Sequence, residues 1–292
     1  MKKGLVSIII PCFNQGQYIF EATDSILNQS YGDFEIIVVN DGSTDSLTNS
    51  ILATLERPNL KVIKTKNQGL AMARNTGIKN SQGEFFIPLD CDDKLTPKYI
   101  EKTMAEIEKD EAIGVVYSDI KVFGNYEDEI KLKQTFIPEI LIENKVSVTS
   151  LVKRTVFDKI LKNNGIGYNP NMEYGYEDWD FWISAIEAKF KLKHIPEPLF
   201  LYRKVGPSMI ANAEKHHIYL INQIMENHKE SFKEFNQEVV AELQNKLKTQ
   251  EKEISKLNNG IKEYETKNRS ITYLVKRLIK VFLMKIGLKS KD

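Results

Sequence analysis

The sequence lacks the features that mark several common classes of protein. It has only two cysteines, Cys12 and Cys91, too few for a disulfide framework or a cysteine-rich metal cluster. Basic and acidic residues nearly balance, 41 against 40, whereas a general nucleic-acid binder usually carries a basic excess. The first apolar run, residues 5–10, is too short for a signal peptide, and no run approaches the ~20 apolar residues of a membrane span. These absences predict a protein of the reducing cytoplasm that binds no nucleic acid.

Familiar nucleotide-binding and hydrolase motifs are missing as well. No G-x-G-x-x-G follows the first apolar run, and the sequence contains neither a G-x-x-x-x-G-K-[ST] segment nor a G-x-S-x-G segment. The four histidines show no zinc-ligand spacing with a cysteine. A nucleotide bound by this chain would therefore need a metal ion, and not a glycine-rich loop, to hold its phosphates.

The first 120 residues alternate between two hydrophobic patterns. Unbroken apolar runs of strand length are typical of strands buried on both faces, and the segments between them have helical spacing. This alternation predicts a doubly wound, mostly parallel, Rossmann-like α/β sheet. The expected strands are 5–10, 34–39, 60–63, 84–88 and 113–117, and the expected helices are 17–28, 47–55, 70–78 and 97–108.

The pattern is less regular from about residue 120 to 212. It predicts a strand at 146–152, a short helix at 154–161, a loop at 163–176 and an aromatic helix at 177–190. Beyond residue 211 the composition shifts to Lys, Glu, Asn and Gln without proline. We therefore expect a catalytic domain over 1–212 and a helical appendage over 213–292.

Three carboxylates lie within four residues directly after the fourth expected strand, at Asp90, Asp92 and Asp93. Ligands of a doubly wound sheet bind at the carboxyl ends of the strands. Three carboxylates this close repel one another unless a cation or hydrogen-bond donors satisfy them, and Mg²⁺ or Mn²⁺ prefers such oxygen ligands. The alternative is an acidic turn in which Asp93 caps the next helix.

A second acidic group stands at the start of the aromatic helix, in the segment Glu-Asp-Trp-Asp-Phe-Trp at 177–182. Acids at a helix N-terminus are stabilised by the helix dipole, which is one interpretation. The other is a general base in a partly dry site walled by rings. Asp41, in an Asp-Gly turn, and Arg74, one turn into a helix, are weaker candidates, and Arg203 is a cation that could reach a phosphate.

Five segments in this order resemble the motifs of the family 2 inverting glycosyltransferases of GT-A fold. They are Ile-Pro-Cys-Phe-Asn at 10–14, Asn-Asp-Gly-Ser-Thr-Asp at 40–45, Asn-Gln-Gly to Arg-Asn at 67–75, Asp-Cys-Asp-Asp at 90–93 and Glu-Asp at 177–178. The resemblance covers roughly residues 4–210. Each segment is weak alone, but five in the right order are specific.

The resemblance implies a role for each matching residue. Phe13 would stack on a base such as uracil, Asp41 would accept a hydrogen bond from the base, and Arg74 would sit near the base or steady Asp41. Asp90 would face the ribose or the metal shell. The nucleotide-binding residues implied in this way are Pro11, Phe13, Asn14, Asp41, Arg74 and Asp90.

The resemblance also implies the reacting groups. Asp92 would ligate the Mn²⁺ or Mg²⁺ that bridges the diphosphate, and Asp178 would be the catalytic base. Glu177 and Trp179 would shape the acceptor side, and Arg203 would approach the diphosphate. Many relatives carry a histidine near the position of Lys204, which predicts fewer protein ligands to the metal here. The processive Q-x-x-R-W signature is absent, which favours transfer of a single sugar.

The expected function is therefore hexosyl transfer from a nucleotide-sugar, with a UDP-sugar favoured, to a glycan or lipid-linked acceptor in bacterial surface polysaccharide assembly. One alternative is a nucleotidyl- or phosphotransferase that uses the same metal carboxylates. The other is a catalytically inactive scaffold of the same fold.

Two patterns characterise the tail. Apolar residues repeat every seven positions over 240–264, which predicts a short coiled coil and self-association, with a helix folded back on the catalytic domain as the alternative. Residues 271–292 hold six basic residues, one acid and a broad apolar face. Such a helix is typical of peripheral contact with an anionic membrane surface, here the inner face of the cell membrane, unless it packs on the core.

Overall fold

The computed structural model describes residues 1–205 and 209–285, so the last seven residues of the expected basic helix lie outside it. The chain divides into two compact units, the first ending at Asn236 and the second beginning at Gln237. Composition placed the boundary at 212. The first unit extends further because Leu220, Ile224 and His228 are buried in it.

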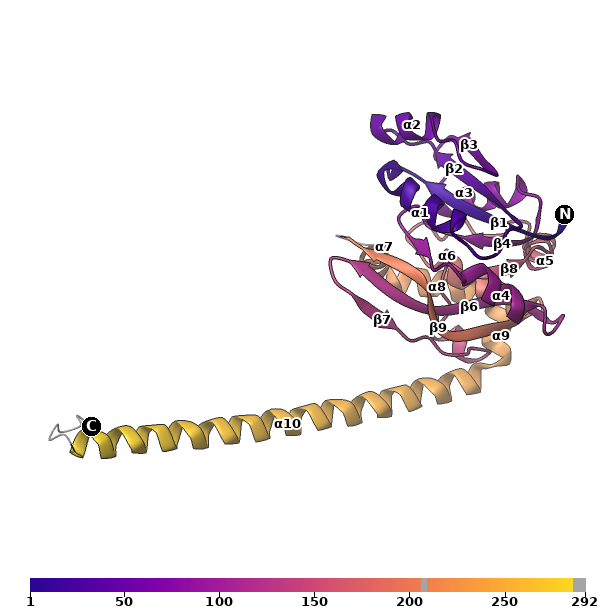
Figure 1. Ribbon diagram of the computed structural model, residues 1–292. Helices are drawn as coiled ribbons and strands as arrows, with labels where there is room; N and C mark the ends of the chain where they lie inside the picture. The colour runs from indigo at the N-terminus through magenta and orange to yellow at the C-terminus, as the bar shows by residue number, and fades with distance from the viewer. Residues whose placement is uncertain (206–208, 286–292) are drawn as a thin grey trace. The chain divides into compact units, whose positions relative to one another are not determined.

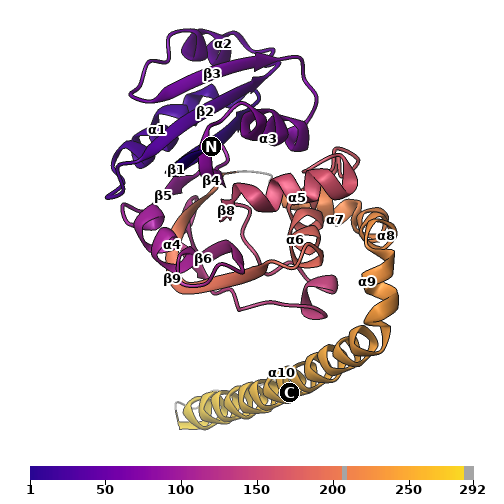
Figure 2. The ribbon, with the colours of Figure 1, turned by 90° about the vertical axis from the view of Figure 1, so that its right-hand side faces the viewer.

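One nine-stranded sheet forms the centre of the first unit. In its N-terminal half the order is β3-β2-β1-β4, and every neighbouring pair is parallel. The mixed α/β fold with a curled, mostly parallel sheet confirms the predicted fold class (Figures 1 and 2). These strands are β1 (Lys2–Cys12), β2 (Phe34–Asp41), β3 (Leu60–Thr65) and β4 (Gly83–Pro88).

The other half of the sheet is mixed. β8 (Leu151–Lys153) is antiparallel to both β4 and β6 (Ile113–Gly124), whereas β6 is parallel to β9 (Lys191–Lys204). The short strands β5 (Lys94–Leu95) and β7 (Asp128–Ile130) pair antiparallel with β9 and β6.

Two details of this half differ from the sequence prediction. The strand expected at 146–152 is limited to β8, because the hydroxyls of Ser147 and Ser150 bond to nearby backbone carbonyls and turn the preceding chain. The 14-residue β9 was not predicted. Its prolines, Pro196 and Pro198, cannot donate ladder hydrogen bonds, and the register against β6 shifts where they lie.

Helices cover both faces of the sheet. Apolar side chains of β1 and β2 cluster on one face with α1 (Ile19–Leu27) and α4 (Tyr99–Ile107). On the other face α3 (Leu70–Lys79) approaches the sheet so closely that a Cβ on Gly77 would lie 2.3 Å from Ile9 Cγ2. The remaining helices of this unit are α2 (Ser46–Ala53), α5 (Arg154–Asn164), α6 (Glu177–Glu187), α7 (Met209–Lys215), α8 (His217–Asn227) and α9 (Lys229–Glu234), with single 3-10 turns at Gly16–Tyr18 and Glu139–Leu141.

The described part of the second unit is one long helix, α10 (Asn236–Lys285), whose first residue is the last of the first unit. It contains the heptad segment and the start of the basic segment. Within the described ranges, none of the helices combines the length and the apolar character needed to cross a membrane.

The approach of α3 to the sheet makes a prediction about Gly77. In an open helix a Gly→Ala change stabilises by roughly 0.5–1 kcal/mol. Here the new methyl group would overlap Ile9 and Val39, so we expect Gly77→Ala to lower the free energy of unfolding by about 1–3 kcal/mol in urea denaturation. Gly32→Ala is the matched control, because nothing lies within 4 Å of its Cβ position. Equal stability of wild type and Gly77→Ala would contradict the close approach.

Candidate active site

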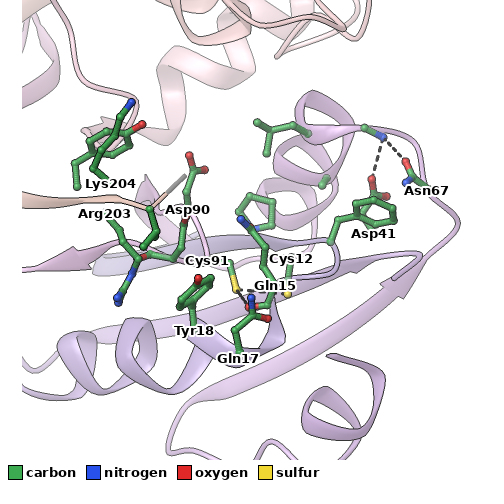
Figure 3. Close-up of a pocket in the computed structure, with 18 residues that line it drawn as sticks. Cys12, Gln15, Gln17, Tyr18, Asp41, Asn67, Asp90, Cys91, Arg203 and Lys204 are labelled. Atoms are coloured by element: carbon green, nitrogen blue, oxygen red, sulfur yellow. Dashed lines mark hydrogen bonds between the residues drawn. The ribbon is translucent and has the colours of Figure 1, made fainter. Parts of the chain in front are cut away.

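A cavity of about 520 Å³ opens at the carboxyl ends of β1, β2 and β4 (Figure 3). We call it the first cavity. Because parallel strands end together at this edge, residues far apart in the sequence meet here. Six of the predicted site residues line it, namely Pro11, Phe13, Asp41, Asp90, Asp92 and Arg203. The lining residues that the sequence did not indicate include Gln15, Tyr18 and Lys204, which belong to no motif, and Asn67, which begins the 67–75 motif.

Phe13 and Asn14 follow β1, and their side chains have different surroundings. The Phe13 ring is 42% exposed and lines the first cavity, so its face is available for stacking. The Asn14 side chain is instead engaged within the protein. Its Oδ1 accepts hydrogen bonds from the backbone N–H of Thr44 at 2.8 Å and of Asp45 at 3.2 Å. Asn14 therefore joins the loop after β1 to the loop after β2, and we find it outside the cavity lining.

Asp41 lines the first cavity and stabilises the loop that forms part of its wall. Its carboxylate accepts hydrogen bonds from Thr65 Oγ1 at 2.9 Å, from the backbone N–H of Gln68 at 3.1 Å and from that of Gly69 at 2.9 Å. The last two donors precede α3 directly, and Gly69 has a φ of +85°, which favours glycine. Asp41 thus ties the end of β2 to the start of α3.

Arg74 pairs with carboxylates other than that of Asp41. Its buried guanidinium donates to Asp90 Oδ1 at 2.8 Å and to Glu177 Oε1, and the expected place near a base stays a prediction. Burial by itself would lower the pKa of Arg74, but the two carboxylates outweigh it and raise that pKa. The arginine therefore joins α3 to the turn after β4 and to the first turn of α6.

The three carboxylates after β4 have different environments. Asp90 and Asp92 are partly exposed and line the first cavity, whereas Asp93 is buried and accepts a hydrogen bond from the backbone N–H of Arg203 at 2.7 Å. Burial first, and then the charge of Asp90, raise the pKa of Asp92 to about 6. Asp93 does not cap α4, which begins at Tyr99 after Lys98.

Asp90 and Asp92 are a donor set that fits a divalent cation. Mg²⁺ and Mn²⁺ commonly take one or two carboxylates and complete their shell with water and substrate phosphates. Within the described ranges no group of three or more His, Cys, Asp or Glu side chains is arranged to hold a metal by itself. The two carboxylates would therefore need the phosphates of a bound ligand to complete a site.

Arg203 lies along the wall of the first cavity. Its Nε donates to the backbone oxygen of Asp92 at 2.7 Å, and its Nη2 pairs with Glu21 Oε2 at 2.9 Å. The guanidinium carbon is 4.8 Å from the centre of the Tyr18 ring and 4.5 Å from that of Phe123. The contact with Glu21 holds the cation toward α1, and Figure 3 shows the side chain near Tyr18. The expected approach of Arg203 to a diphosphate stays a prediction.

A second cavity, also of about 520 Å³, adjoins the first. Its wall includes Asp178 and Trp179, and much of the remainder is apolar, with Ile120, Ile142 and Val148 among its side chains. Three residues line both cavities, namely Leu70, Asp90 and Tyr202. The two cavities therefore meet at Asp90.

Asp178 stands in the first turn of α6 facing the second cavity. Its Oδ2 accepts a hydrogen bond from Asn144 Nδ2 at 3.0 Å and its Oδ1 from the backbone N–H of Trp179 at 2.8 Å. Burial first, and then the charge of Glu177, raise the pKa of Asp178 to about 7. A carboxylate with a pKa near neutrality suits a general base. Asn144 had no sequence signal, because it lies in an irregular segment far from any motif.

Glu177 and Trp179, the two neighbours of Asp178, are both buried. Glu177 pairs with Arg74, and the Trp179 indole Nε1 donates to the backbone oxygen of Ile140 at 2.6 Å. Residues 177–179 therefore line one cavity, and both neighbours anchor the turn that carries Asp178.

Comparison with known proteins identifies the family. A protein-family model described as glycosyl transferase family 2 matches residues 7–166, which are more than half of the chain. The chain belongs to glycosyltransferase family 2. A glycosyltransferase of Haemophilus influenzae is 33% identical over 215 residues, which cover 69% of this chain and 66% of that protein. Glycosyltransferase GlyG of Streptococcus pneumoniae is 26% identical over 227 residues, with 70% and 73% covered.

Solved structures agree on the fold of this family 2 chain. Residues 1–349 of S. aureus TarS, in complex with UDP-GlcNAc, superpose with a TM-score of 0.62 at 21% identity, covering 76% of this chain and 66% of that one. At this identity the likeness establishes the GT-A-like fold. The chain spans 66% of the H. influenzae relative and only 36% of a Rickettsia felis glycosyltransferase.

The outer side of α6 is held by a buried histidine of this family 2 chain. His228 Nδ1 lies 2.9 Å from Glu187 Oε2, and its Nε2 lies 3.3 Å from Asp180 Oδ1. Burial by itself would lower the pKa of His228, but the hydrogen bonds to Asp180 and Glu187 raise it to about 9. The imidazolium therefore connects α6, which carries Asp178, to the end of α8.

The His228 contacts predict a pH-dependent stability. In the folded protein the pKa of His228 is about 9, above its ordinary value of 6.5. The charged imidazolium therefore adds its full contribution to the free energy of unfolding below pH 6.5, and this contribution is lost as the pH rises through about 9. At about 1.4 kcal/mol for each pH unit between these values, the loss is about 3 kcal/mol. We expect the difference in unfolding free energy between wild type and His228→Gln to shrink by this amount from pH 6 to pH 10. A constant difference would contradict a charged His228.

Proposed function

We propose that this chain is an inverting glycosyltransferase that moves one hexosyl group from a nucleotide-sugar, with a UDP-sugar favoured, to an acceptor hydroxyl. The observation that carries the proposal is the meeting of the two cavities at Asp90. One cavity has an exposed aromatic ring and three carboxylates, and the other has a desolvated carboxylate that faces a partly apolar space. A donor in the first and an acceptor in the second would bring their reacting atoms together.

The donor side is supported by the chemistry of the first cavity. Phe13 offers a ring face for the base, and Asp41 fixes the wall opposite Asp90. TarS has been solved with UDP and with UDP-GlcNAc, which favours UDP as the nucleotide of this related fold. The roles of Pro11 and Asn14 would be to shape the loop after β1.

Metal dependence is part of the proposal, with Mn²⁺ or Mg²⁺ held by Asp92 and by Asp90 together with the donor diphosphate. A bound divalent cation supplies charge stabilisation to the phosphate oxygens as the sugar departs. Arg74 keeps the Asp90 carboxylate oriented. Burial and the negative charge of Asp90 disfavour the ionised form of Asp92, and a bound cation would offset this repulsion between the two carboxylates.

The acceptor side supplies the base. Asp178 would take the proton from the acceptor hydroxyl while that oxygen attacks the anomeric carbon from the face opposite the nucleoside diphosphate. The bond from the anomeric carbon to the phosphate oxygen breaks, its electron pair remains on the phosphate, and the configuration inverts. Asn144 and the Trp179 N–H orient the carboxylate for this step.

Two rival functions are less well supported. A nucleotidyl- or phosphotransferase would use the carboxylates of the first cavity but would have no need of Asp178 in the second. An inactive scaffold would have no need of either carboxylate group, and both are retained. We therefore favour sugar transfer to a glycan or lipid-linked acceptor in surface polysaccharide assembly. A cytoplasmic location with peripheral membrane contact through residues 271–292 stays a prediction.

Replacement of Asp178 tests the base. We expect Asp178→Asn to lower kcat by about 10²–10⁴-fold while the Kd for UDP changes less than about twofold, because the side chain lies outside the first cavity. Wild-type kcat should rise with pH through about 7 as the carboxyl group ionises. Asp158→Asn, an exposed carboxylate on α5, is the control. Full transfer by Asp178→Asn would remove Asp178 as the base.

A donor panel tests the nucleotide and the metal. The chain is incubated with UDP-, GDP- and CMP-sugars in Mn²⁺ or in EDTA, and nucleotide release and UDP binding are measured. We expect slow UDP release from one sugar in Mn²⁺ only, and at least tenfold weaker Mn²⁺-dependent UDP binding by Asp92→Asn. Absence of both release and binding in Mn²⁺ would favour the scaffold instead.

A further inference from the structure

The long helix α10 carries an apolar stripe with one polar exception, Gln250. Its core residues recur at the first and fourth positions of a seven-residue repeat, the a and d positions of a coiled coil, and their side chains are 43–68% exposed. A spacing of 3.5 residues keeps such a stripe on one side only when two helices supercoil around each other. The exposed stripe consists of Val240, Leu243, Leu247, Ile254, Leu257, Ile261 and Tyr264.

The surface of α10 has a hollow that could accept a core side chain of a second helix. Of the six residues that line this hollow, four are spaced as i, i+3, i+4 and i+7, namely Leu257, Gly260, Ile261 and Tyr264. This diamond is the hole into which one side chain of a facing helix inserts in a coiled coil. Gly260 opens the hole because it has no side chain, and nothing within 4 Å would meet a Cβ there.

The charges and polar core positions select the partner. In a parallel, in-register pair, position g of one helix faces position e of the next heptad on the other, so Lys246 faces Glu251 of the second copy. The next such pair, Glu253 with Asn258, is free of like-charge repulsion. Asn268 continues the repeat at an a position, where a single asparagine specifies register and a two-stranded state.

We propose that α10 pairs with α10 of a second copy of this chain in a parallel, in-register, two-stranded coiled coil. Val, Ile and Leu at the a positions, with Leu at two of the d positions, suit two strands. Both chains then enter the coil at the same end. The proposal is independent of the chemistry at Asp178 and extends the self-association predicted from the heptads to an orientation, a register and a stoichiometry.

The mass of the full chain in solution tests the pairing. Light scattering after size-exclusion chromatography should give twice the 33.6 kDa of one chain. Ile254→Glu with Ile261→Glu, two core changes, should give the monomer mass. Ser255→Glu with Asn259→Glu adds the same charge on the outer side and should stay dimeric. A monomeric or trimeric wild type, or a dimer that survives the core changes, would overturn the proposal.

Cross-linking tests the orientation. Under mild oxidation Leu243→Cys should form a disulfide-linked dimer, because the two residues 243 face each other only in a parallel, in-register pair. In an antiparallel pair that aligns the stripe 240–264 with itself, they would lie roughly 27 Å apart by the helical rise. Asn245→Cys, on the outer side of the same turn, is the control for random collision. No cross-linking of Leu243→Cys, or equal cross-linking of both variants, would overturn the parallel register.

Discussion

The buried guanidinium of Arg74 is the interaction on which both cavities depend. It pairs with Asp90, which lies where the cavities meet, and with Glu177, which precedes the candidate base. A charge at this depth is tolerated only when it is paired and hydrogen-bonded, and removing one partner of such a pair typically costs about 3–5 kcal/mol. The arginine therefore sets where the first turn of α6 lies relative to the carboxyl end of β4.

Four aspartates in and near the two cavities differ in their surroundings, although their side chains are chemically the same. Asp41 and Asp93 are buried and accept backbone hydrogen bonds, so they serve as fixed struts between loops. Asp92 and Asp178 are desolvated, and the pKa of each is raised, to about 6 and about 7. A negative charge at these two positions is costly until a cation or an acceptor proton compensates it. The same type of side chain thus connects loops at two positions, and it carries the proposed reacting groups at two others.

The two compact units differ in how they bury their apolar side chains. The first unit buries its apolar side chains between the sheet and the helices on its two faces. The described part of the second unit is one helix, α10, which leaves an apolar stripe exposed. An isolated helix cannot bury such a stripe against itself, so its stability depends on another surface. A second copy supplies a surface of matching repeat.

The sequence by itself determined the α/β class, the strands β1 to β4 and the family, because unbroken apolar runs and short motifs are local signals. It also indicated residues 90–93 and 177–179 as the segments that carry the candidate metal ligand and the candidate base. Only the tertiary structure decided that Arg74 bonds Asp90 and Glu177 and not Asp41, that Asn144 orients Asp178, and that β9 joins the sheet despite two prolines. These depend on contacts between residues up to 103 positions apart, and side-chain pairing at such separations leaves no periodic trace in the chain.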